Sequence, residues 1–265
     1  MERYVMLELK RVGLFVRDDI QEFPEDGITK LFGRAGVEVI KDAREFAANL
    51  DLVIALGGDG TVLRALTQYP HVPVLAVNYG SVGFLTQSHR EDLEKVLVRI
   101  LSDDYFIEER LTLDILHGGE RYRSINEVVI KGVSHMIEVA TFINGRLVHT
   151  PRGDGIIVGT PTGSTAYLMS TGAPLVVPDV DCLVVKPLNE YSISSRTIIL
   201  PGETHVRLRV DFGRETDVMM VIDGAQQVSL EDGAEIEIRR SETPARLVCF
   251  ESDYFFRNLK ERLRW

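Results

Sequence analysis

The segment LVIALGGDGTVLR, Leu52–Arg64, combines the features of a strand, a binding loop and a helix. An unbroken apolar run of strand length leads directly into Gly57, Gly58 and Gly60, and a helical pattern starts at Thr61. Apolar runs without polar alternation are typical of strands that are buried on both faces of a parallel sheet. Glycines let the backbone turn sharply and approach a ligand with no Cβ in the way. The segment therefore predicts an α/β protein with a ligand loop at the carboxyl end of a strand.

The same alternation of strand and helix extends through the N-terminal part of the chain. Such alternation is typical of an open, mostly parallel sheet that is covered by helices. We predict strands at Arg11–Val16, Val37–Ile40, Leu52–Leu56 and Val74–Val77, and helices at Ile28–Arg34, Thr61–Gln68 and Glu91–Leu101.

The pattern changes near Phe106, where hairpins replace helices. LTLDIL at 111–116 and RYRSINEVVI at 121–130 predict one hairpin, and IEVATFI and RLVHT on either side of Asn144-Gly145 predict another, because Asn-Gly favours a tight hairpin turn. The tail, Asp253–Leu263, carries apolar residues at helical spacing and is expected to pack on another element. Further strands are predicted at Gly155–Val158, Cys182–Val185, Thr197–Leu200, His205–Val210, Val218–Ile222, Glu235–Arg239 and Arg246–Phe250.

The composition narrows the class of protein. The 265 residues are 45% hydrophobic and 26% charged, as in globular proteins and unlike disordered or fibrous ones. No apolar run approaches the roughly 20 residues of a membrane helix, and the first residues do not match a signal peptide. The net charge of −10 argues against nucleic acid as the main partner. Cys182 and Cys249 cannot form a disulfide framework, which favours the reducing cytoplasm. Together with the charge and the lack of a long apolar run, this leads us to expect a cytoplasmic protein that binds neither nucleic acid nor membrane.

Asp59 is the only acid inside the glycine loop. The amides that open the following helix suit a phosphate, and an aspartate among them would repel phosphate unless it holds a metal or accepts a proton. The alternative is a tight turn in which Asp59 only caps the helix. The loop matches neither GxxxxGK[ST] nor GxGxxG, so a nucleotide here would need different phosphate-binding residues.

Two further segments could contribute to binding. NYGSVGFL at 78–85 follows the next predicted strand, so it could line the same crevice as the first loop or form a plain turn. Asn126 and Glu127 interrupt an apolar strand, and one of the two should point inward because neighbouring residues alternate between faces. An amide beside a carboxylate suits the hydroxyls of a ribose. A strand end or a bulge is the alternative explanation.

The segment 151–178 gathers the most functional side chains. Arg152 and Asp154 precede a predicted strand, and Thr160–Tyr167, TPTGSTAY, follows it. Small hydroxylated residues that lead into a helical pattern offer donors and close backbone approach, and Tyr167 could stack on a flat ring. Tight packing of a helix on a sheet is the alternative.

Other catalytic patterns are missing from the sequence. The six histidines form no HExxH or HxH pair, and neither cysteine lies in CxxC, so no metal site is predicted from protein ligands. The chain also lacks GxSxG, which argues against a hydrolase elbow.

The four segments together resemble the NAD kinase family. GGDGT at 57–61, NYGSVGFL at 78–85, NEVVI at 126–130 and DGIIVGTPTGSTAY at 154–167 occur in that family's order and spacing, and Asp223-Gly224 also fits. GGDG alone is shared with lipid kinases and phosphofructokinase-like enzymes, whereas TPTGSTAY is specific to a much smaller group of proteins. The resemblance implies an α/β domain with an open, mostly parallel sheet, a β-rich, sandwich-like domain and a C-terminal helix that returns to the first. On this chain it implies residues 1–105 with 252–265 for the first domain and 106–251 for the second.

The resemblance also implies an activity and its residues. The expected reaction is phosphorylation of the 2′-hydroxyl of the adenosine ribose of NAD by ATP or polyphosphate, with Mg²⁺ or another divalent cation accompanying the donor, to make NADP. Asp59 would be the general base, and self-association into a dimer or tetramer is expected, with some contacts reaching the ligand from a neighbouring subunit. Substrate contacts are implied at Gly57, Gly58, Gly60, Arg64, Asn126, Glu127, Arg152, Asp154, Thr165, Ala166, Tyr167 and Ser170.

Departures from the family leave some assignments open. The loop at 188–194, LNEYSIS, lacks the family's histidine, which leaves the role of Asn189 open. Ala225 separates Asp223-Gly224 from Gln226 and Gln227, so either glutamine or neither would meet the ligand. A lipid or sugar kinase with the same GGDG loop is the alternative function, and a binding protein with an inactive site is a third.

Overall fold

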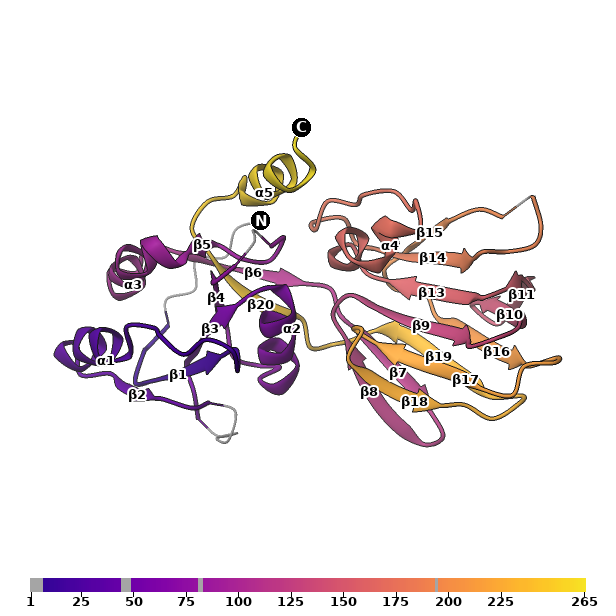
Figure 1. Ribbon diagram of the computed structural model, residues 1–265, viewed down its shortest axis with the longest axis horizontal. Coiled ribbons are helices and arrows are strands. Elements are labelled where there is room, and N and C mark those ends of the chain that lie inside the picture. Colours follow the sequence, from indigo (N-terminus) through magenta and orange to yellow (C-terminus); the bar gives the residue numbers. More distant parts are fainter. Residues whose placement is uncertain (1–6, 44–48, 81–82, 194) are drawn as a thin grey trace. The chain divides into compact units, whose positions relative to one another are not determined.

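Figure 1 presents a computed structural model that describes residues 7–43, 49–80, 83–193 and 195–265. The chain forms two compact units. Unit 1 comprises residues 1–109 and 244–265, and unit 2 comprises residues 110–243. Each unit has its own apolar core.

Unit 1 is an α/β unit built on a mostly parallel sheet. The strand order is β2-β1-β3-β4-β20-β6, and β5 pairs with β4. The pairs among β1–β5 and between β4 and β20 are parallel. The strands are β1 (Arg11–Val16), β2 (Glu38–Ile40), β3 (Leu52–Gly57), β4 (Val74–Asn78), β5 (Ser88–His89), β6 (Phe106–Arg110) and β20 (Ala245–Cys249).

Helices bury the sheet of unit 1, as the purple and yellow ribbons of Figure 1 show. Every residue of β3 and β4 is buried, which agrees with the apolar runs that predicted them. Apolar side chains of α1 and α3 share one core with the sheet, among them Phe32 and Ile100. The helical segments are α1 (Glu25–Arg34), α2 (Asp59–Gln68), η1 (Arg90–Asp92), α3 (Leu93–Leu101) and α5 (Tyr254–Leu263).

The limits of unit 1 differ from the sequence-based ones. The sequence placed residues 106–251 in the β-rich part, whereas β6 and β20 belong to the sheet of unit 1. Leu247 of β20 pairs in parallel with Val74 of β4. The pattern could not reveal this, because a short apolar strand looks the same in either sheet. The chain therefore leaves unit 1 near Glu109 and returns at Pro244.

Unit 2 is a sandwich of two antiparallel sheets. One sheet has the order β11-β10-β16-β19-β7-β8, with β12 paired to β10, and the other has the order β15-β14-β13-β9-β17-β18. Inward-facing residues of both sheets, such as Ile115 of β7 and Val158 of β13, form one core. The strands are β7 (Leu113–His117), β8 (Glu120–Ser124), β9 (Glu127–Gly132), β10 (Ile137–Ile143), β11 (Arg146–His149), β12 (Arg152–Gly153), β13 (Gly155–Gly159), β14 (Cys182–Leu188), β15 (Ile198–Pro201), β16 (Val206–Asp211), β17 (Val218–Ile222), β18 (Gln226–Ser229) and β19 (Glu235–Arg240).

The two predicted hairpins have different outcomes. Asn144 and Gly145 have φ of 48° and 80° and join β10 to β11, as predicted for an Asn-Gly turn. RYRSINEVVI was predicted as one strand of a hairpin, but it is two strands of different sheets. The chain pairs β8 with β7, crosses at Ile125 and Asn126, and continues as β9 in the other sheet. Asn126 therefore lies where the chain changes sheets.

A short helical segment covers the outer face of the β9-containing sheet. It comprises the turn η2 (Thr162–Thr165) and the helix α4 (Tyr167–Ser170). Leu168 packs there with Val129 and Ile157 in a second, smaller core of unit 2. The fold predicted from the sequence, an α/β unit and a β-rich unit with a C-terminal helix in the first, is thus confirmed. In the described part of the chain, no helix has the length and apolar character needed to cross a membrane.

Candidate active site

Asp59 is held in one orientation by a loop that lies 25 residues further along the chain. Its Oδ2 accepts the backbone N–H of Phe84 at 2.8 Å, and its Oδ1 accepts that of Leu85 at 3.1 Å. The helix cap is Gly58, and no side chain caps it. The capping alternative for Asp59 is therefore wrong. The carboxylate joins the two glycine loops at the carboxyl ends of β3 and β4.

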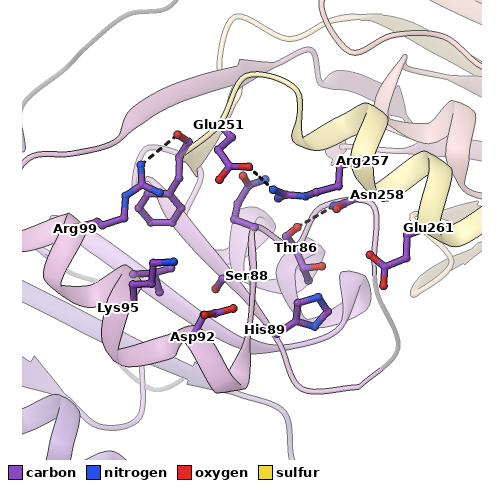
Figure 2. A pocket seen from close by; sticks show the side chains of 13 residues that line it. Thr86, Ser88, His89, Asp92, Lys95, Arg99, Glu251, Arg257, Asn258 and Glu261 are labelled. Carbon is purple, nitrogen blue, oxygen red and sulfur yellow. Dashed lines mark hydrogen bonds and ion pairs between the residues drawn. The ribbon is translucent and has the colours of Figure 1, made fainter.

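The second loop is itself braced. The N–H of Gly83 donates to Oγ1 of Thr86 at 3.2 Å, and Nδ2 of Asn258 on α5 donates to the carbonyl of Thr86 at 3.0 Å. Figure 2 shows this contact between α5 and the end of the loop. A Cβ at Gly83 would collide with the Asp59 carboxylate, so only glycine lets the loop approach it. Ser81 and Val82 of the predicted loop lie outside the described residues.

The glycines of the first loop have different structural roles. A Cβ at Gly57 would collide with the side chain of Thr61, so this position needs glycine for the turn from β3 into α2. Gly58 and Gly60 have no described protein atom within 4 Å of a Cβ position. The first amides of a helix have no partner within it, so this opening can donate hydrogen bonds to an anion.

Arg64 is the exposed basic residue on α2 among the predicted site residues. Its Nη1 lies 3.9 Å from Oδ2 of Asp18, which follows β1. Half of the Arg64 side chain is exposed, so the guanidinium can exchange this weak pair for a phosphate. The Asn78 side chain, at the end of β4, is instead occupied by the backbone of its own loop. Its Nδ2 donates to the Gly80 carbonyl at 3.1 Å, and its Oδ1 accepts the Gly80 N–H at 3.0 Å.

A polar cleft of about 270 Å³ lies beside α3 and α5 in unit 1, as Figure 2 shows. Its rim is tied by Arg257 to Glu251 and by Arg99 to the carbonyl of Phe250. Both signs of charge line it: the cations are Lys95, Arg99 and Arg257, and the acids are Asp92, Glu251 and Glu261. None of the predicted site residues lines this cleft, but Thr86, which braces the second glycine loop, does.

In unit 2 the structure brings Asn126 and Glu127 together with the TPTGSTAY segment. The N–H of Thr160 donates to the Asn126 carbonyl at 2.9 Å, and the Thr160 hydroxyl donates to the Ile125 carbonyl at 2.6 Å. A Cβ at Gly163 would collide with the Asn126 carbonyl. The two motifs, predicted separately, thus form one surface, and Gly163 is needed for their close approach.

Both Asn126 and Glu127 are buried, with 9% and 5% of their surfaces exposed. Both residues are buried where the chain changes sheets, so the alternation of a single strand, on which the prediction of one inward-facing residue rested, does not apply to Asn126. Burial and then the charge of Asp223 raise the pKa of Glu127 to about 8, with a partial opposing effect from the Tyr167 amide. Its Oε2 has no hydrogen-bond partner among the described residues. Glu127 is therefore protonated at neutral pH and has an oxygen free for a ligand.

The TPTGSTAY segment and the helix that follows it carry the other predicted site residues of this region. The Thr165 hydroxyl donates to the Thr162 carbonyl at 3.1 Å, and the Ser170 hydroxyl donates to the Tyr167 carbonyl at 2.8 Å. Ala166 lies between η2 and α4. Tyr167 is 45% exposed, so its ring is open for stacking.

Arg152 and Asp154 lie at the opposite end of the strands from Asn126 and Glu127. In the pairing of β13 with β9, Gly155 faces Lys131 and Gly159 faces Glu127. Asp154 therefore precedes the far end of β13. Its Oδ2 accepts Nδ2 of Asn189 at 2.7 Å, which identifies a contact for Asn189. Ser194 of the same loop lies outside the described residues.

Sequence reasoning missed the role of one carboxylate. Asp223 was noted only as part of a matching Asp-Gly pair, but its carboxylate accepts the N–H groups of Ile125, Asn126 and Glu127. The Asp-Gly turn was the available signal. Its partners could not be read from the sequence because they lie about a hundred residues earlier. Gln226 and Gln227, beyond this turn, are both exposed.

A metal ion has to be considered for phosphoryl transfer. In residues 7–43, 49–80, 83–193 and 195–265, no three His, Cys, Asp or Glu side chains are grouped as ligands. Mg²⁺ commonly needs only one or two carboxylates, because substrate phosphates supply further oxygens. A carboxylate such as Asp18, exposed beyond β1, is of the right chemistry to complete such a set.

The fold and these sites define a class of protein. A GGDG loop that opens a helix at the carboxyl end of a parallel strand, together with a second, β-rich unit, agrees with the resemblance of the sequence to kinases that carry a GGDG loop. Comparison with known proteins identifies the family within this class.

The family models of the ATP-NAD kinase N-terminal domain and C-terminal domain match residues 16–105 and 125–250. An NAD kinase of Citrifermentans bemidjiense is 33% identical over 91% of this chain and 87% of its own length. An NAD kinase of Thermobifida fusca is 36% identical over 97% of this chain and 82% of its own. The chain belongs to the NAD kinase family. The predicted family and enzyme class are confirmed, and the lipid or sugar kinase alternative has no support.

Solved structures agree with the fold. An NAD kinase from Archaeoglobus fulgidus, in complex with ATP, has a TM-score of 0.81 and 28% identity, over 96% of this chain and 98% of the other. Yeast NADH kinase, complexed with NADH, has a TM-score of 0.86 over 97% and 88% of the two chains. At 22% identity, the yeast enzyme supports the fold alone.

Proposed function

We propose that this protein transfers the γ-phosphoryl group of ATP to the 2′-hydroxyl of the adenosine ribose of NAD. The bond from the γ-phosphorus to the β–γ bridging oxygen breaks, a bond to the ribose oxygen forms, and NADP and ADP leave. Inorganic polyphosphate is the alternative donor. The observation that carries the proposal is the carboxylate of Asp59, which two backbone N–H groups hold beside the opening of α2.

Asp59 is the proposed general base. A ribose hydroxyl is a weak nucleophile, and a carboxylate within hydrogen-bond reach can take its proton as the new bond forms. Phosphoryl transfer otherwise needs positioning and charge neutralisation more than covalent help. The amides beside Gly57, Gly58 and Gly60 and the guanidinium of Arg64 would supply donors to the phosphates.

Asn126 and Glu127 are the proposed contacts to the nucleotide in unit 2. A protonated Glu127 both donates and accepts, so it can pair with ribose hydroxyls without placing a negative charge beside the phosphates. Tyr167 would stack on a base, and Thr165, Ala166 and Ser170 would complete the same surface.

Arg152 and Asp154 would act from a second copy of the chain. Within one chain they lie at the opposite end of the strands from Glu127, so one nucleotide would be reached most directly by the Asp154 of another subunit. The edge strand β11, whose Leu147 and Val148 are 59% and 51% exposed, would support such association. We therefore propose a dimer or tetramer.

A divalent cation, Mg²⁺ in the first instance, would accompany the donor. When bound, it would neutralise charge on the phosphates. Asp59 and Asp18 are the residues of unit 1 with the right chemistry to hold it, while the phosphates would provide most of its ligands.

The test is an assay of NADP formation by the purified protein with NAD, ATP and Mg²⁺, read with an NADP-specific dehydrogenase. We expect product with ATP or with polyphosphate, and none when EDTA is present. Absence of NADP with both donors would contradict the proposal. Light scattering tests the association, and mixing an Asp154→Asn chain with a Glu127→Ala chain tests shared sites, because mixed oligomers should regain activity.

A further inference from the structure

We propose that Asp223 is a positioning residue that fixes the backbone of Ser124–Glu127 and thereby sets the affinity for the nucleotide. The inference rests on the proposed function, in which Asn126 and Glu127 contact NAD. It adds Asp223, which contacts the backbone of Asn126 and Glu127 and does not itself contact the substrate.

The carboxylate of Asp223 gathers four donors from one short segment. Its Oδ1 accepts the Ser124 hydroxyl at 2.7 Å, the Asn126 N–H at 2.8 Å and the Glu127 N–H at 3.2 Å. Its Oδ2 accepts the Ile125 N–H at 2.9 Å. In return, the Asp223 N–H donates to the Glu127 carbonyl at 3.0 Å. The segment in which the chain changes sheets is thus held residue by residue.

A turn requirement does not explain this carboxylate. Asp223 and Gly224 have φ of 48° and 68° in the turn between Ile222 of β17 and Gln226 of β18, and asparagine adopts such a positive φ as readily as aspartate. Asn144 and Gly145 have a similar pair of positive φ angles in another hairpin of the same unit, and the Asn144 side chain accepts the N–H of His205. What distinguishes position 223 is the need for a strong acceptor with several lone pairs.

The segment has little else to hold it. Between the end of β8 at Ser124 and the start of β9 at Glu127, the chain leaves one sheet for the other, so no strand ladder spans Ile125 and Asn126. Their carbonyls are bound by Thr160, and their N–H groups are bound by Asp223. Removal of the carboxylate would release the donor side of this segment, which orients the Asn126 and Glu127 side chains.

The pair of strands β9 and β17 provides a matched control at the end opposite Asp223. Glu215 precedes β17, and its carboxylate accepts the N–H groups of Ser134, His135, Thr216 and Asp217. These backbone hydrogen bonds, those of His135 and Ser134 foremost, lower the pKa of Glu215 to about 2. Glu215 is 5% exposed. It is therefore a comparable carboxylate clamp whose bonded partners include none of the proposed site residues.

The experiment compares Asp223→Asn with Glu215→Gln in the full chain, by steady-state kinetics and by calorimetric titration with NAD. For Asp223→Asn we expect the KM and Kd for NAD to rise by about tenfold or more, while the KM for ATP changes less than about twofold. For Glu215→Gln we expect a lower melting temperature and wild-type values for both substrates. Unchanged NAD affinity in Asp223→Asn, or an equal loss in Glu215→Gln, would overturn the inference.

A milder variant decides the matter if Asp223→Asn does not fold. Ser124→Ala removes one of the four donors and should raise the KM for NAD about twofold to threefold at unchanged KM for ATP. Equal KM values for NAD in Ser124→Ala and wild type would then overturn the inference. Failure of the proposed function is distinguishable, because in that case the wild type itself would make no NADP.

Discussion

Asp59 at the end of β3 in unit 1 and Glu127 at the start of β9 in unit 2 are candidate carboxyl groups that are held in opposite ways. Asp59 is half-buried, and both of its oxygens accept backbone N–H groups from the loop after β4. Glu127 is buried, has one oxygen without a partner among the described residues, and has a pKa raised to about 8. The comparison teaches that surroundings, and not residue type, assign the roles: a hydrogen-bonded acceptor in unit 1 and a protonated group in unit 2.

The comparison predicts that Asp59 acts on turnover. Asp59→Asn keeps the size of the side chain but cannot accept the proton, so kcat should fall by about 10²–10⁴-fold, with NAD affinity close to wild type. Rapid-quench kinetics and NAD titration measure the two quantities. Asp103→Asn, an exposed aspartate in the turn after α3, is the control of equal charge change. Near-normal kcat in Asp59→Asn would remove the general base from the proposal.

Distortion of the loop that holds Asp59 should lower kcat nearly as much as loss of the carboxylate. Gly83→Ala places a methyl group against the Asp59 carboxylate, so the acceptor or the loop must shift, and we expect kcat to fall by about 100-fold. Gly80→Ala in the same loop has its nearest neighbour, Nη1 of Arg17, at 3.9 Å and should behave as wild type. Equal kinetics of the two alanine variants would show that the orientation of Asp59 is unimportant.

Glu127 should make the free energy of unfolding depend on pH. Its folded pKa of about 8 exceeds the ordinary 4.5, so the folded state binds the proton more tightly. The stabilisation is complete below about pH 4.5 and is lost as pH rises towards about 8, a change of roughly 3 kcal/mol between pH 5 and pH 8. Glu127→Gln has no titrating group at this position, so its stability should not change with pH for this reason. Urea unfolding of both proteins at the two pH values should show the difference, and parallel pH profiles would contradict the protonated state.

Of the four substitutions predicted here, Arg64→Ala should have the smallest effect. Its guanidinium is half-exposed and only weakly paired, so Arg64→Ala should raise the KM for ATP by about threefold to tenfold with little change in the KM for NAD. Initial-rate kinetics with each substrate varied measures the split. Arg34→Ala, which removes an exposed arginine at the end of α1, serves as the control. An equal rise for both substrates would place Arg64 outside the phosphate site.

Much of the fold could be predicted because its signals are local. The apolar run, the glycines and the helical spacing of residues 52–68 lie next to one another, and the structure has β3 and α2 there. Asn144-Gly145 likewise specifies its own turn. By contrast, RYRSINEVVI divides between two sheets and β20 joins the sheet of unit 1, because pairing partners are chosen by register and burial in the whole unit.

The candidate site divides in the same way. Asp59, Asn126, Glu127 and the TPTGSTAY segment could be singled out because their side-chain chemistry interrupts apolar strands or follows them. Whether Asp59 caps its helix could not be decided, because the competing partners, the amides of Phe84 and Leu85, belong to another loop. The elevated pKa of Glu127 also depends on burial and on Asp223, neither of which is local.

The sequence by itself determined the family, the kinds of element and most of the candidate residues, since glycine loops, turn residues and side-chain periodicity act over a few positions. Only the tertiary structure decided what each carboxylate does. Phe84 and Leu85 reach Asp59, and Asp223 reaches Ser124–Glu127, across 25 to 99 residues of chain. Such contacts form only when strands far apart in the sequence align in register, and the hydrogen bonds and burial that result set the orientation of Asp59 and the protonation of Glu127.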